Sequence, residues 1–531
     1  MAWEALVSRT PTEIESRTAF VEVAGSGPDY LTYSSLLDDE LCADIDRRAY
    51  AAARGWYLDH GTDLTDVDGV SLGRAFELPA TVTLVRLLRA KAVLRAIAGR
   101  GPIALAGVGD EWDHAARELG LAVIRLAAEA GPRAWVVPDP AIAPPERSRR
   151  FAARLASAMP SARSIAFLGS PAWARPYRQA LPAGDLEVIN PGKRVLLDAV
   201  TSRRRPRFSW LADSLEAASA VEAAPPVGHA SDEIASLRAL FDAASARMAA
   251  LAVAPAVRRR RVLIATEDVS PSARIAALAT LAAGGRVLTL EHGITGGYRE
   301  QVHSVATVLG TWGESQARYH RLAGAPGQTV SPIGWPRLAT QRLAPIRQAR
   351  YDVVYFGQPV PSLSAGSWPE DAINAARAVG SYAGRHPTRR VAWKPHPASD
   401  AYGGAFEPGP QVRRVAGESL DLIAQAHIVA VTTSTTALEA MALGRPVIQL
   451  VGRGHFGGPD FVAESGAVSR VASVEEFEHV AERLLGDPAA RRRAVDAGRA
   501  YLGAFISGFA SAGQAERRLV ELVTDLAAEI G

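Results

Sequence analysis

Short apolar runs recur along most of this chain, and many of them end abruptly in polar, glycine-rich or proline-rich loops. Runs of this length, separated by helical patterns, predict buried strands of parallel sheets. From about residue 102 onward the order of strand, loop, helix and strand is typical of an α/β protein. The strands predicted in this way cover residues 103–108, 121–126, 134–137, 165–168, 194–197, 262–265, 286–290, 305–309, 329–333, 351–356, 391–393, 428–431 and 446–450.

The order of these elements divides the chain into three parts. Residues 1–95 are expected to form a mostly helical extension, residues 96–340 a first Rossmann-like domain, and residues 350–531 a second one that ends in amphipathic helices. Within the first domain, the alanine-rich stretch 206–256 is expected to be helical. Two doubly wound domains in tandem predict a cleft between them, and the terminal helices could pack back across the linker.

Composition limits the classes of protein that the chain can belong to. Hydrophobic residues make up 48% and charged residues 22%, the balance of a soluble globular protein. The net charge is only +3 and the arginine clusters lack interleaved aromatic residues, so nucleic acid is not an expected partner. The amino-terminal residues lack the basic segment and apolar core of a signal peptide, and the single Cys42 excludes an internal disulfide. We therefore expect a cytoplasmic protein, with weak peripheral contact at the acidic lipid of the inner membrane as an open alternative.

The segment Lys394-Pro395-His396-Pro397 follows a short buried strand. Two prolines on either side of one histidine disfavour helix and stiffen the backbone. The imidazole is therefore predicted on a rigid loop at the carboxyl end of a strand, beside a lysine. A histidine on such a loop can simply hydrogen-bond to backbone, but the neighbouring lysine and a second anion-binding turn favour a phosphate-binding role.

The second anion-binding turn is a run of hydroxyl residues from Thr432 to Thr436, between a buried strand and a helix that carries Glu439. Free N–H groups at the start of a helix favour an anion. The helix is apolar around Glu439, so this carboxylate needs a partner. A ligand hydroxyl and the ammonium group of Lys394 are the two alternatives.

With these motifs the chain resembles GT-B glycosyltransferases of bacterial surface-polysaccharide synthesis. The likeness is to families that use cytidine-activated donors: Kdo transferases, sialyltransferases with an HP motif and CDP-glycerol glycerophosphotransferases. The matching pieces, within residues 260–455, are Lys394-Pro395-His396-Pro397, Ser434-Thr435-Thr436 with Glu439, Gly444-Arg445-Pro446-Val447, Glu291-His292-Gly293 and Gly334-Trp335-Pro336-Arg337.

The resemblance implies a donor site in the second domain. It implies that His396 contacts the donor phosphate, that Ser434 and Thr435 bind phosphate, and that Glu439 holds the ribose or the base. Which of the hydroxyl residues from Thr433 to Thr436 contacts the ligand stays open, because the pair is not strictly Ser-Ser. The candidate donor-binding residues are Lys394, His396, Ser434, Thr435, Thr436, Glu439 and Gln358.

The group that activates the acceptor is expected at the strand ends that face the cleft. A transferase needs a base for the acceptor hydroxyl, or a carboxylate nucleophile for a double displacement. His292 matches the histidine of the "HG" segment, and Asp268 and Asp110 suit a Kdo-transferase-like reaction. Each of the acids can instead simply cap a turn. The candidate catalytic residues are His292, Asp268, Asp110 and Glu291, with Glu267 and Glu111 beside them.

Neither a cofactor nor a metal ion is expected. The two Asp-x-Asp sequences, at residues 44–46 and 66–68, do not follow a strand of the α/β units. The predicted partners are a nucleotide-sugar donor, with a CMP-linked donor favoured, and a glycan, glycolipid or protein-linked acceptor. A CDP-glycerol-type polyol-phosphate transferase and a non-catalytic GT-B-like module of a polysaccharide-assembly complex are the alternatives.

Overall fold

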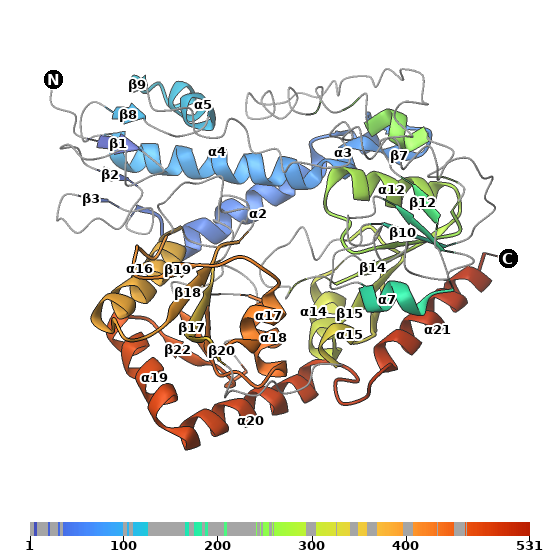
Figure 1. Cartoon of the computed structure of the whole chain (residues 1–531). Coiled ribbons are helices and arrows are strands. Elements are labelled where there is room, and N and C mark those ends of the chain that lie inside the picture. The colour runs from blue at the N-terminus through green and yellow to red at the C-terminus, as the bar shows by residue number, and fades with distance from the viewer. Residues whose placement is uncertain are drawn as a thin grey trace.

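The structure is a computed structural model (Figure 1). It describes residues 5–7, 20–21, 30–31, 36–98, 103–105, 110–125, 165–168, 175–182, 186–189, 207–209, 241, 245, 248–253, 258, 260–291, 293, 304–324, 327–339, 349–357, 369–396, 407–432, 434–450, 462 and 465–530.

A seven-stranded parallel sheet forms the centre of the first α/β unit (residues 165–339), in the order β12-β11-β10-β13-β14-β15-β16. The chain winds outward in both directions from the neighbouring strands β10 and β13, which makes the sheet doubly wound. Three of its strands, β10, β13 and β15, are buried along their whole length, as expected for parallel strands covered by helices on both faces. The strands are β10 (Ile165–Leu168), β11 (Leu186–Ile189), β12 (Arg207–Ser209), β13 (Val262–Ala265), β14 (Arg286–Leu290), β15 (Val308–Thr311) and β16 (Thr329–Pro332).

A six-stranded parallel sheet forms the second α/β unit (residues 351–505), in the order β19-β18-β17-β20-β21-β22. This sheet is also doubly wound, here from β17 and β20. The predicted α/β fold with two Rossmann-like units is therefore confirmed. The strands are β17 (Tyr351–Phe356), β18 (Val391–Lys394), β19 (Arg413–Arg414), β20 (Ala426–Val431), β21 (Val447–Leu450) and β22 (Ser469–Val471).

Helices cover the faces of the two large sheets. In the first unit they are α7 (Arg175–Ala180), α12 (Pro271–Ala282), α14 (Glu314–Ala323) and α15 (Pro336–Ala339). In the second unit they are α16 (Pro369–Arg385), α17 (Ser419–Ala424), α18 (Thr436–Ala442), α19 (Val474–Gly486) and α20 (Pro488–Phe505).

A third parallel sheet, with five strands in the order β3-β2-β1-β8-β9, lies at the amino-terminal end of the chain. The strands are β1 (Ala5–Val7), β2 (Phe20–Val21), β3 (Tyr30–Leu31), β8 (Ile103–Leu105) and β9 (Val123–Arg125). The sequence predicted β8 and β9 as strands of the first α/β unit, but they pair with the amino-terminal segment instead. Strands of two or three residues are too short to give a hydrophobic pattern, so β1, β2 and β3 were not predicted.

The helix predicted for residues 206–256 differs from the structure in its first residues, and two predicted strands cannot be compared with it. β11 and β12 lie at residues 186–189 and 207–209, and β12 occupies the start of a stretch predicted to be helical. An alanine-rich composition favours helix only weakly, and pairing with β11 at the sheet edge overrides it here. The strands predicted at residues 134–137 and 194–197 lie outside the described residues.

The helical part of the amino-terminal extension consists of α2 (Asp39–Gly55), α3 (Leu72–Ala75) and α4 (Glu77–Ile97), with α5 (Asp110–Glu118) between β8 and β9. Two small hairpins connect α2 to α3: β4 (Leu58–Asp59) with β5 (Thr62–Asp63), and β6 (Asp66–Val67) with β7 (Val70–Ser71). Figure 1 shows α2 and α4 as two long helices, and they pack along each other.

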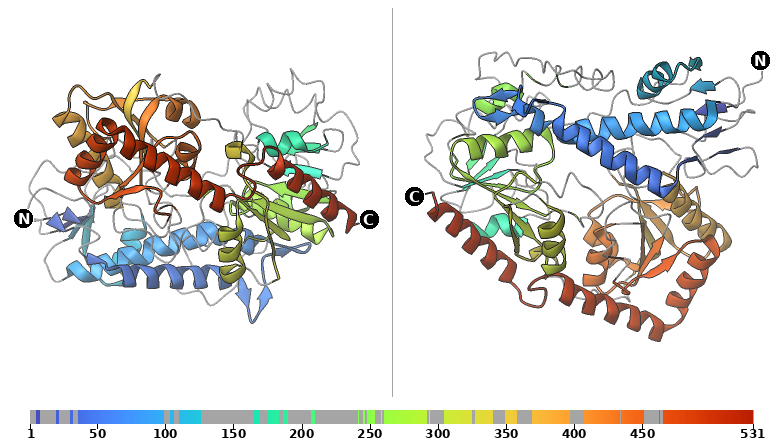
Figure 2. Two further views of the ribbon diagram at one scale, coloured as in Figure 1. Left: turned by 90° about the horizontal axis from the view of Figure 1, so that it is seen from below. Right: turned by 180° about the vertical axis from the view of Figure 1, so that it is seen from behind.

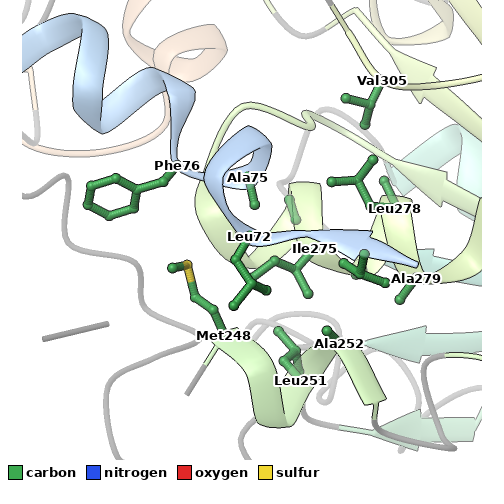
Figure 3. Packing of buried hydrophobic residues seen from close by; sticks show 14 of the residues in the cluster. Leu72, Ala75, Phe76, Met248, Leu251, Ala252, Ile275, Leu278, Ala279 and Val305 are labelled. Carbon is green, nitrogen blue, oxygen red and sulfur yellow. The ribbon is translucent and has the colours of Figure 1, made fainter. Parts of the chain in front are cut away.

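The extension packs on the first unit through α12. Ten of the residues of α12 are buried, from Pro271 to Thr280, so this helix has no face toward solvent. Most of these residues are apolar, as expected for a helix buried on all sides. Figure 3 shows how Leu72 and Phe76 of the extension lie with Ile275 of α12 and Met248 in one buried cluster.

A buried ion pair joins the extension to α12. The guanidinium of Arg274, on α12, lies 3.0 Å from a carboxylate oxygen of Glu77, the first residue of α4, and their side chains are 1% and 8% exposed. The other oxygen of Glu77 accepts a hydrogen bond from the hydroxyl of Tyr57 at 3.1 Å. Burial and the neighbouring carboxylate raise the pKa of Tyr57 well above its usual value, so the hydroxyl keeps its proton.

We expect Glu77→Ala to lower the free energy of unfolding by about 3–5 kcal/mol, because it leaves the charge of Arg274 buried without its carboxylate. The double variant Glu77→Ala, Arg274→Met is expected to recover most of that loss. Urea unfolding curves of the wild type, the single variant and the double variant measure both effects. If Glu77→Ala unfolds at the same urea concentration as the wild type, the ion pair does not stabilise the fold.

The carboxyl-terminal helices connect the two α/β units. α20 packs on α18 of the second unit, and α21 (Gln514–Ala528) packs on α7 and on strands of the first unit. Figure 2 shows these helices running along one side of both units, one after the other. The expectation that the terminal helices pack back across the linker is confirmed, and two doubly wound units joined in this way form the GT-B-like arrangement.

The segment that connects α20 to α21, residues 506–513, lies against the strand ends of the first unit. The backbone N–H of Ser507 donates a hydrogen bond to the carbonyl of Trp312 at 2.8 Å. A Cβ at Gly313 would lie 1.7 Å from the carbonyl oxygen of Phe505, and one at Gly334 would lie 2.3 Å from that of Ser507. Glycine at both positions allows this close approach of backbone to backbone.

Among the described helices, none combines the length and the apolar character that crossing a bilayer requires.

Candidate functional site

The carboxyl edge of the second sheet is where a ligand is expected. Strand order reverses between β17 and β20, so the loops after these two strands diverge to opposite faces of the sheet. In open α/β sheets the crevice at this point is the usual ligand site. The lysine and histidine motif follows β18, next to β17, and the hydroxyl residues follow β20, so both predicted halves of the donor site lie at this edge.

β18 carries the first half of the site. Its first three residues are buried and Lys394 is partly exposed at the carboxyl end. The backbone N–H of Gly357, which follows β17, donates to the carbonyl of Lys394 at 3.0 Å and holds the two strand ends together. His396 is partly buried, and burial together with the positive charge of Lys394 lowers its pKa. The free chain therefore holds this imidazole neutral at neutral pH.

The hydroxyl residues after β20 form the second half. The N–H of Thr436 donates to the hydroxyl oxygen of Ser434 at 3.2 Å, and that hydroxyl donates to the hydroxyl oxygen of Thr436 at 3.0 Å. Ser434 and Thr436 thus brace the turn, whereas the side chain of Thr435, at the N-cap of α18, makes no capping bond. The hydroxyl of Ser434 is thus used within the turn, whereas those of Thr435 and Thr436 are candidates to donate to a ligand. Thr433 lies outside the described residues.

Glu439 lies one turn into α18, on the same face as Thr435, because residues four apart meet on a helix. One of its carboxylate oxygens forms an ion pair with the guanidinium of Arg337 at 3.2 Å. The sequence offered a ligand hydroxyl or Lys394 as its partner, and the structure shows an ion pair with Arg337, which neither alternative included. Burial is the main cause that raises the pKa of Glu439, and the negative charge of Glu418 raises it further. The positive charges of Arg337 and Lys394 lower it in part. Lys394 lies at the carboxyl end of β18 and Glu439 follows that of β20, and both strands pair with β17, so the two halves of the site lie at one edge of the sheet.

Arg337 reaches this site from the other α/β unit. It lies on α15, directly after β16, so it comes from the carboxyl edge of the first sheet. Because Glu439 follows the carboxyl end of β20, the pair shows that the two carboxyl edges face each other at this point. Sequence reasoning did not select Arg337, although the segment Gly334-Trp335-Pro336-Arg337 stood out as a signal.

Two of the predicted catalytic acids are occupied in structural contacts. Asp268 is buried, and one of its oxygens accepts from the hydroxyl of Ser304 and from the N–H of Val305, both at 2.6 Å. Glu291 is buried as well and accepts from the N–H of Trp312 at 3.1 Å and from the amide of Gln316 at 2.6 Å. A carboxylate that holds two neighbouring segments in this way is poorly placed to attack or to deprotonate a substrate.

The remaining catalytic candidates are placed as follows. Glu267 accepts from the N–H groups of Val269 and Ser270, so it holds the turn that leads into α12. Asp110 begins α5 after β8, in the amino-terminal sheet, and the structure does not bring it to the sheet edge that carries Asp268. His292 and Gln358 lie outside the described residues, and their roles stay predictions.

Another conspicuous motif, Gly444-Arg445-Pro446, has a structural role. The side chain of Arg445 is buried and donates to the carbonyls of Ile423 and Ala424 at 3.2 and 2.8 Å. These carbonyls belong to the last turn of α17, which has no intrahelical partners for them. The part of the chain that the structure describes contains no group of three or more His, Cys, Asp or Glu side chains arranged to hold a metal ion.

Comparisons with known proteins find only distant structural similarity. A scan of family models and a search of curated proteins both find no match. Among solved structures, the UDP-GlcNAc 2-epimerase of Methanocaldococcus jannaschii is 13% identical, with a TM-score of 0.43, over 68% of this chain and 99% of that one. A UDP-glucosyltransferase from Polygonum tinctorium is 12% identical, with a TM-score of 0.40, over 70% and 100%. The glycotransferase of kitacinnamycin is 15% identical, with a TM-score of 0.42, over 69% and 100%. At these values the likeness carries no argument about activity, which must come from the site.

Proposed function

We propose that this chain is a metal-independent glycosyltransferase that binds a nucleotide-activated sugar at the carboxyl edge of its second sheet. The observation that carries the proposal is that Lys394 and His396 lie at the carboxyl end of β18 while Thr435 and Glu439 follow β20, at the edge of the sheet where the strand order reverses. Cationic and hydroxyl groups of this kind suit a phosphate, and a carboxylate beside them suits the hydroxyl groups of a ribose.

The chemistry follows from where charge develops during glycosyl transfer. When the sugar leaves the nucleotide, negative charge grows on the departing phosphate. Lys394 and His396 lie at a rigid strand end and can stabilise that charge without rearranging. For the base that deprotonates the acceptor we propose His292, because the structure commits the neighbouring Glu291 and the nearby Asp268 to other contacts.

For the donor we propose a CMP-linked sugar of the Kdo or nonulosonate type, with a surface glycan or related acceptor at the inner face of the membrane. Support for the cytidine nucleotide is the likeness of the Lys394-to-Pro397 segment to that of cytidine-dependent enzymes. A polyol-phosphate transferase would use the same edge of the sheet, because its donor also leaves a nucleotide phosphate.

Nucleotide release from CMP-Kdo, CMP-sialate, CDP-glycerol, UDP-glucose and UDP-GlcNAc tests the proposal. We expect release from a CMP-linked sugar in the presence of a glycan acceptor. Turnover of CDP-glycerol alone would move the assignment to polyol-phosphate transfer. Epimerisation of UDP-GlcNAc without an acceptor, or binding without turnover of every donor, would contradict the proposed transferase.

Donor affinity is expected to rise as the pH falls. A bound phosphate stabilises the charged imidazole of His396, so its pKa is higher in the complex than in the free chain, where it is lowered. Affinity therefore increases as the pH falls through the pKa of the complex, and it levels off below the lowered pKa of the free chain. Calorimetric titration with a CMP-linked sugar from about pH 8 to about pH 5.5 measures this, since its phosphodiester does not titrate there. His396→Asn is expected to flatten the profile, and an equally flat profile for the wild type would contradict the phosphate contact.

A further inference from the structure

We propose that Arg337 is a donor-phosphate ligand contributed by the first α/β unit, and that Glu439 holds it in place until the donor arrives. On binding, the guanidinium passes from the Glu439 carboxylate to the phosphate, and the carboxylate passes to a ribose hydroxyl. This inference rests on the proposed function, because it needs a nucleotide at the carboxyl edge of the second sheet.

The first observation is the position of the ion pair. The side chains of Arg337 and Glu439 are 15% and 10% exposed, and their atoms approach to 3.2 Å. Glu439 is the residue expected to contact the ribose, on the same face of α18 as Thr435. The guanidinium therefore lies against the donor site itself. The positive charge of Lys394, at the end of β18, also lowers the pKa of Glu439, but less than that of Arg337 does.

The second observation is the rigid attachment of α15. Trp335 and Leu338 belong to the same buried cluster as Ala437 and Leu438 of α18, although they come from the other unit. The ring of Trp335 stacks on that of Trp312 with centroids 3.9 Å apart and planes 8° apart. Both tryptophans are almost fully buried. The backbone of Arg337 is thus fixed beside α18, and an exchange of partners needs only side-chain rotation.

The third argument is energetic. A buried ion pair costs so much desolvation that it often stabilises a fold no better than apolar residues would. A guanidinium is also a better match for phosphate, to which it can donate two parallel hydrogen bonds, than a single lysine is. Glu439 is buried, and that burial raises its pKa because water solvates the charged carboxylate poorly there. Exchange lets the carboxylate accept from a neutral hydroxyl while the guanidinium keeps an anionic partner in the donor phosphate.

The alternative is that the pair is only an interdomain clamp, and the two roles predict different ligand dependences. The probes are the nucleosides cytidine and uridine, the nucleotides CMP and UDP, and inorganic pyrophosphate, titrated by calorimetry into the wild type and into Arg337→Gln, Arg337→Lys and Glu439→Gln. Thermal midpoints establish that each variant is folded.

For a phosphate ligand, Arg337→Gln is expected to weaken nucleotide binding by about tenfold to a hundredfold and to leave nucleoside binding within about threefold. The nucleotide affinity of Arg337→Lys is expected to lie between those of the wild type and Arg337→Gln. Glu439→Gln is expected to weaken nucleoside binding, while pyrophosphate binds as well as before or more tightly because the guanidinium is released.

The proposal is overturned if Arg337→Gln and Glu439→Gln lower the thermal midpoint alike while the ratio of nucleotide to nucleoside affinity stays at its wild-type value. That result identifies a clamp. If the wild type binds none of the nucleotides, the proposed function itself fails, and the exchange fails with it. A wild type that binds a nucleotide together with an unaffected Arg337→Gln refutes the exchange alone.

Discussion

His396→Ala is expected to lower the rate of donor turnover by on the order of 100- to 1,000-fold, while the thermal midpoint stays close to that of the wild type. The imidazole lies at the rigid end of β18 beside Lys394, where it can donate to the departing phosphate. Its side chain is only partly buried, so removing it leaves little cavity. Initial rates of nucleotide release at saturating donor measure the loss.

His427→Ala is the matched control for this variant. His427 is also partly buried and its pKa is also lowered, chiefly by burial, but it is the second residue of β20 and lies near the amino edge of the same sheet. We expect its replacement to leave turnover unchanged. Wild-type turnover by His396→Ala, or an equal loss in both variants, would contradict a contact between His396 and the donor phosphate.

Gly313→Ala is expected to destabilise the contact between the first unit and the chain where α20 ends and the segment to α21 begins. The added Cβ would lie 1.7 Å from the carbonyl oxygen of Phe505 and 2.8 Å from its carbonyl carbon. Both atoms are backbone, so no flexible side chain can move aside, and overpacking of this kind typically costs about 1–3 kcal/mol, occasionally more. A lower thermal midpoint and faster proteolysis near residue 507 are the expected results.

Gly503→Ala is the control for the glycine prediction. Gly503 is exposed within α20, and a Cβ there would meet no atom within 4 Å. Alanine inside a helix is more stable than glycine by about 0.5–1 kcal/mol, so this variant is expected to raise the thermal midpoint slightly. If Gly313→Ala behaves like Gly503→Ala, the close approach of the two backbones is not present in solution.

Hydrophobic periodicity predicts the two large sheets well and the amino-terminal sheet poorly. Strands such as β17 and β20 are largely apolar runs bounded by loops, so each is recognisable from its own residues. β1, by contrast, spans three residues, and its partner β8 lies almost a hundred residues further along the chain. A pairing over that sequence distance between such short segments leaves no local signal. The sequence therefore assigned β8 and Asp110 to the first α/β unit, whereas the structure places β8 in the amino-terminal sheet and Asp110 at the start of the helix that follows it.

The candidate site was predictable where one motif contains its own chemistry. Lys394 and His396 are placed by a strand and two prolines, all within a few residues. The partner of Glu439 was not predictable, because Arg337 comes from another unit and only the folded chain brings the two together. Asp268 and Glu291 show the converse. They stand at strand ends as catalytic acids do, and only their hydrogen bonds to Ser304 and Gln316 reveal a structural role.

Hydrogen exchange in the presence of nucleotides tests the central claim most directly, because it locates the binding site on the chain. With saturating CMP, CDP or UDP, at least one nucleotide is predicted to slow exchange in peptides that cover β18 with His396 and the turn into α18. Peptides from α2 and α4 should exchange as in the free chain. Protection confined to other parts of the chain, or none with any of the three nucleotides, would contradict a nucleotide site at this sheet edge.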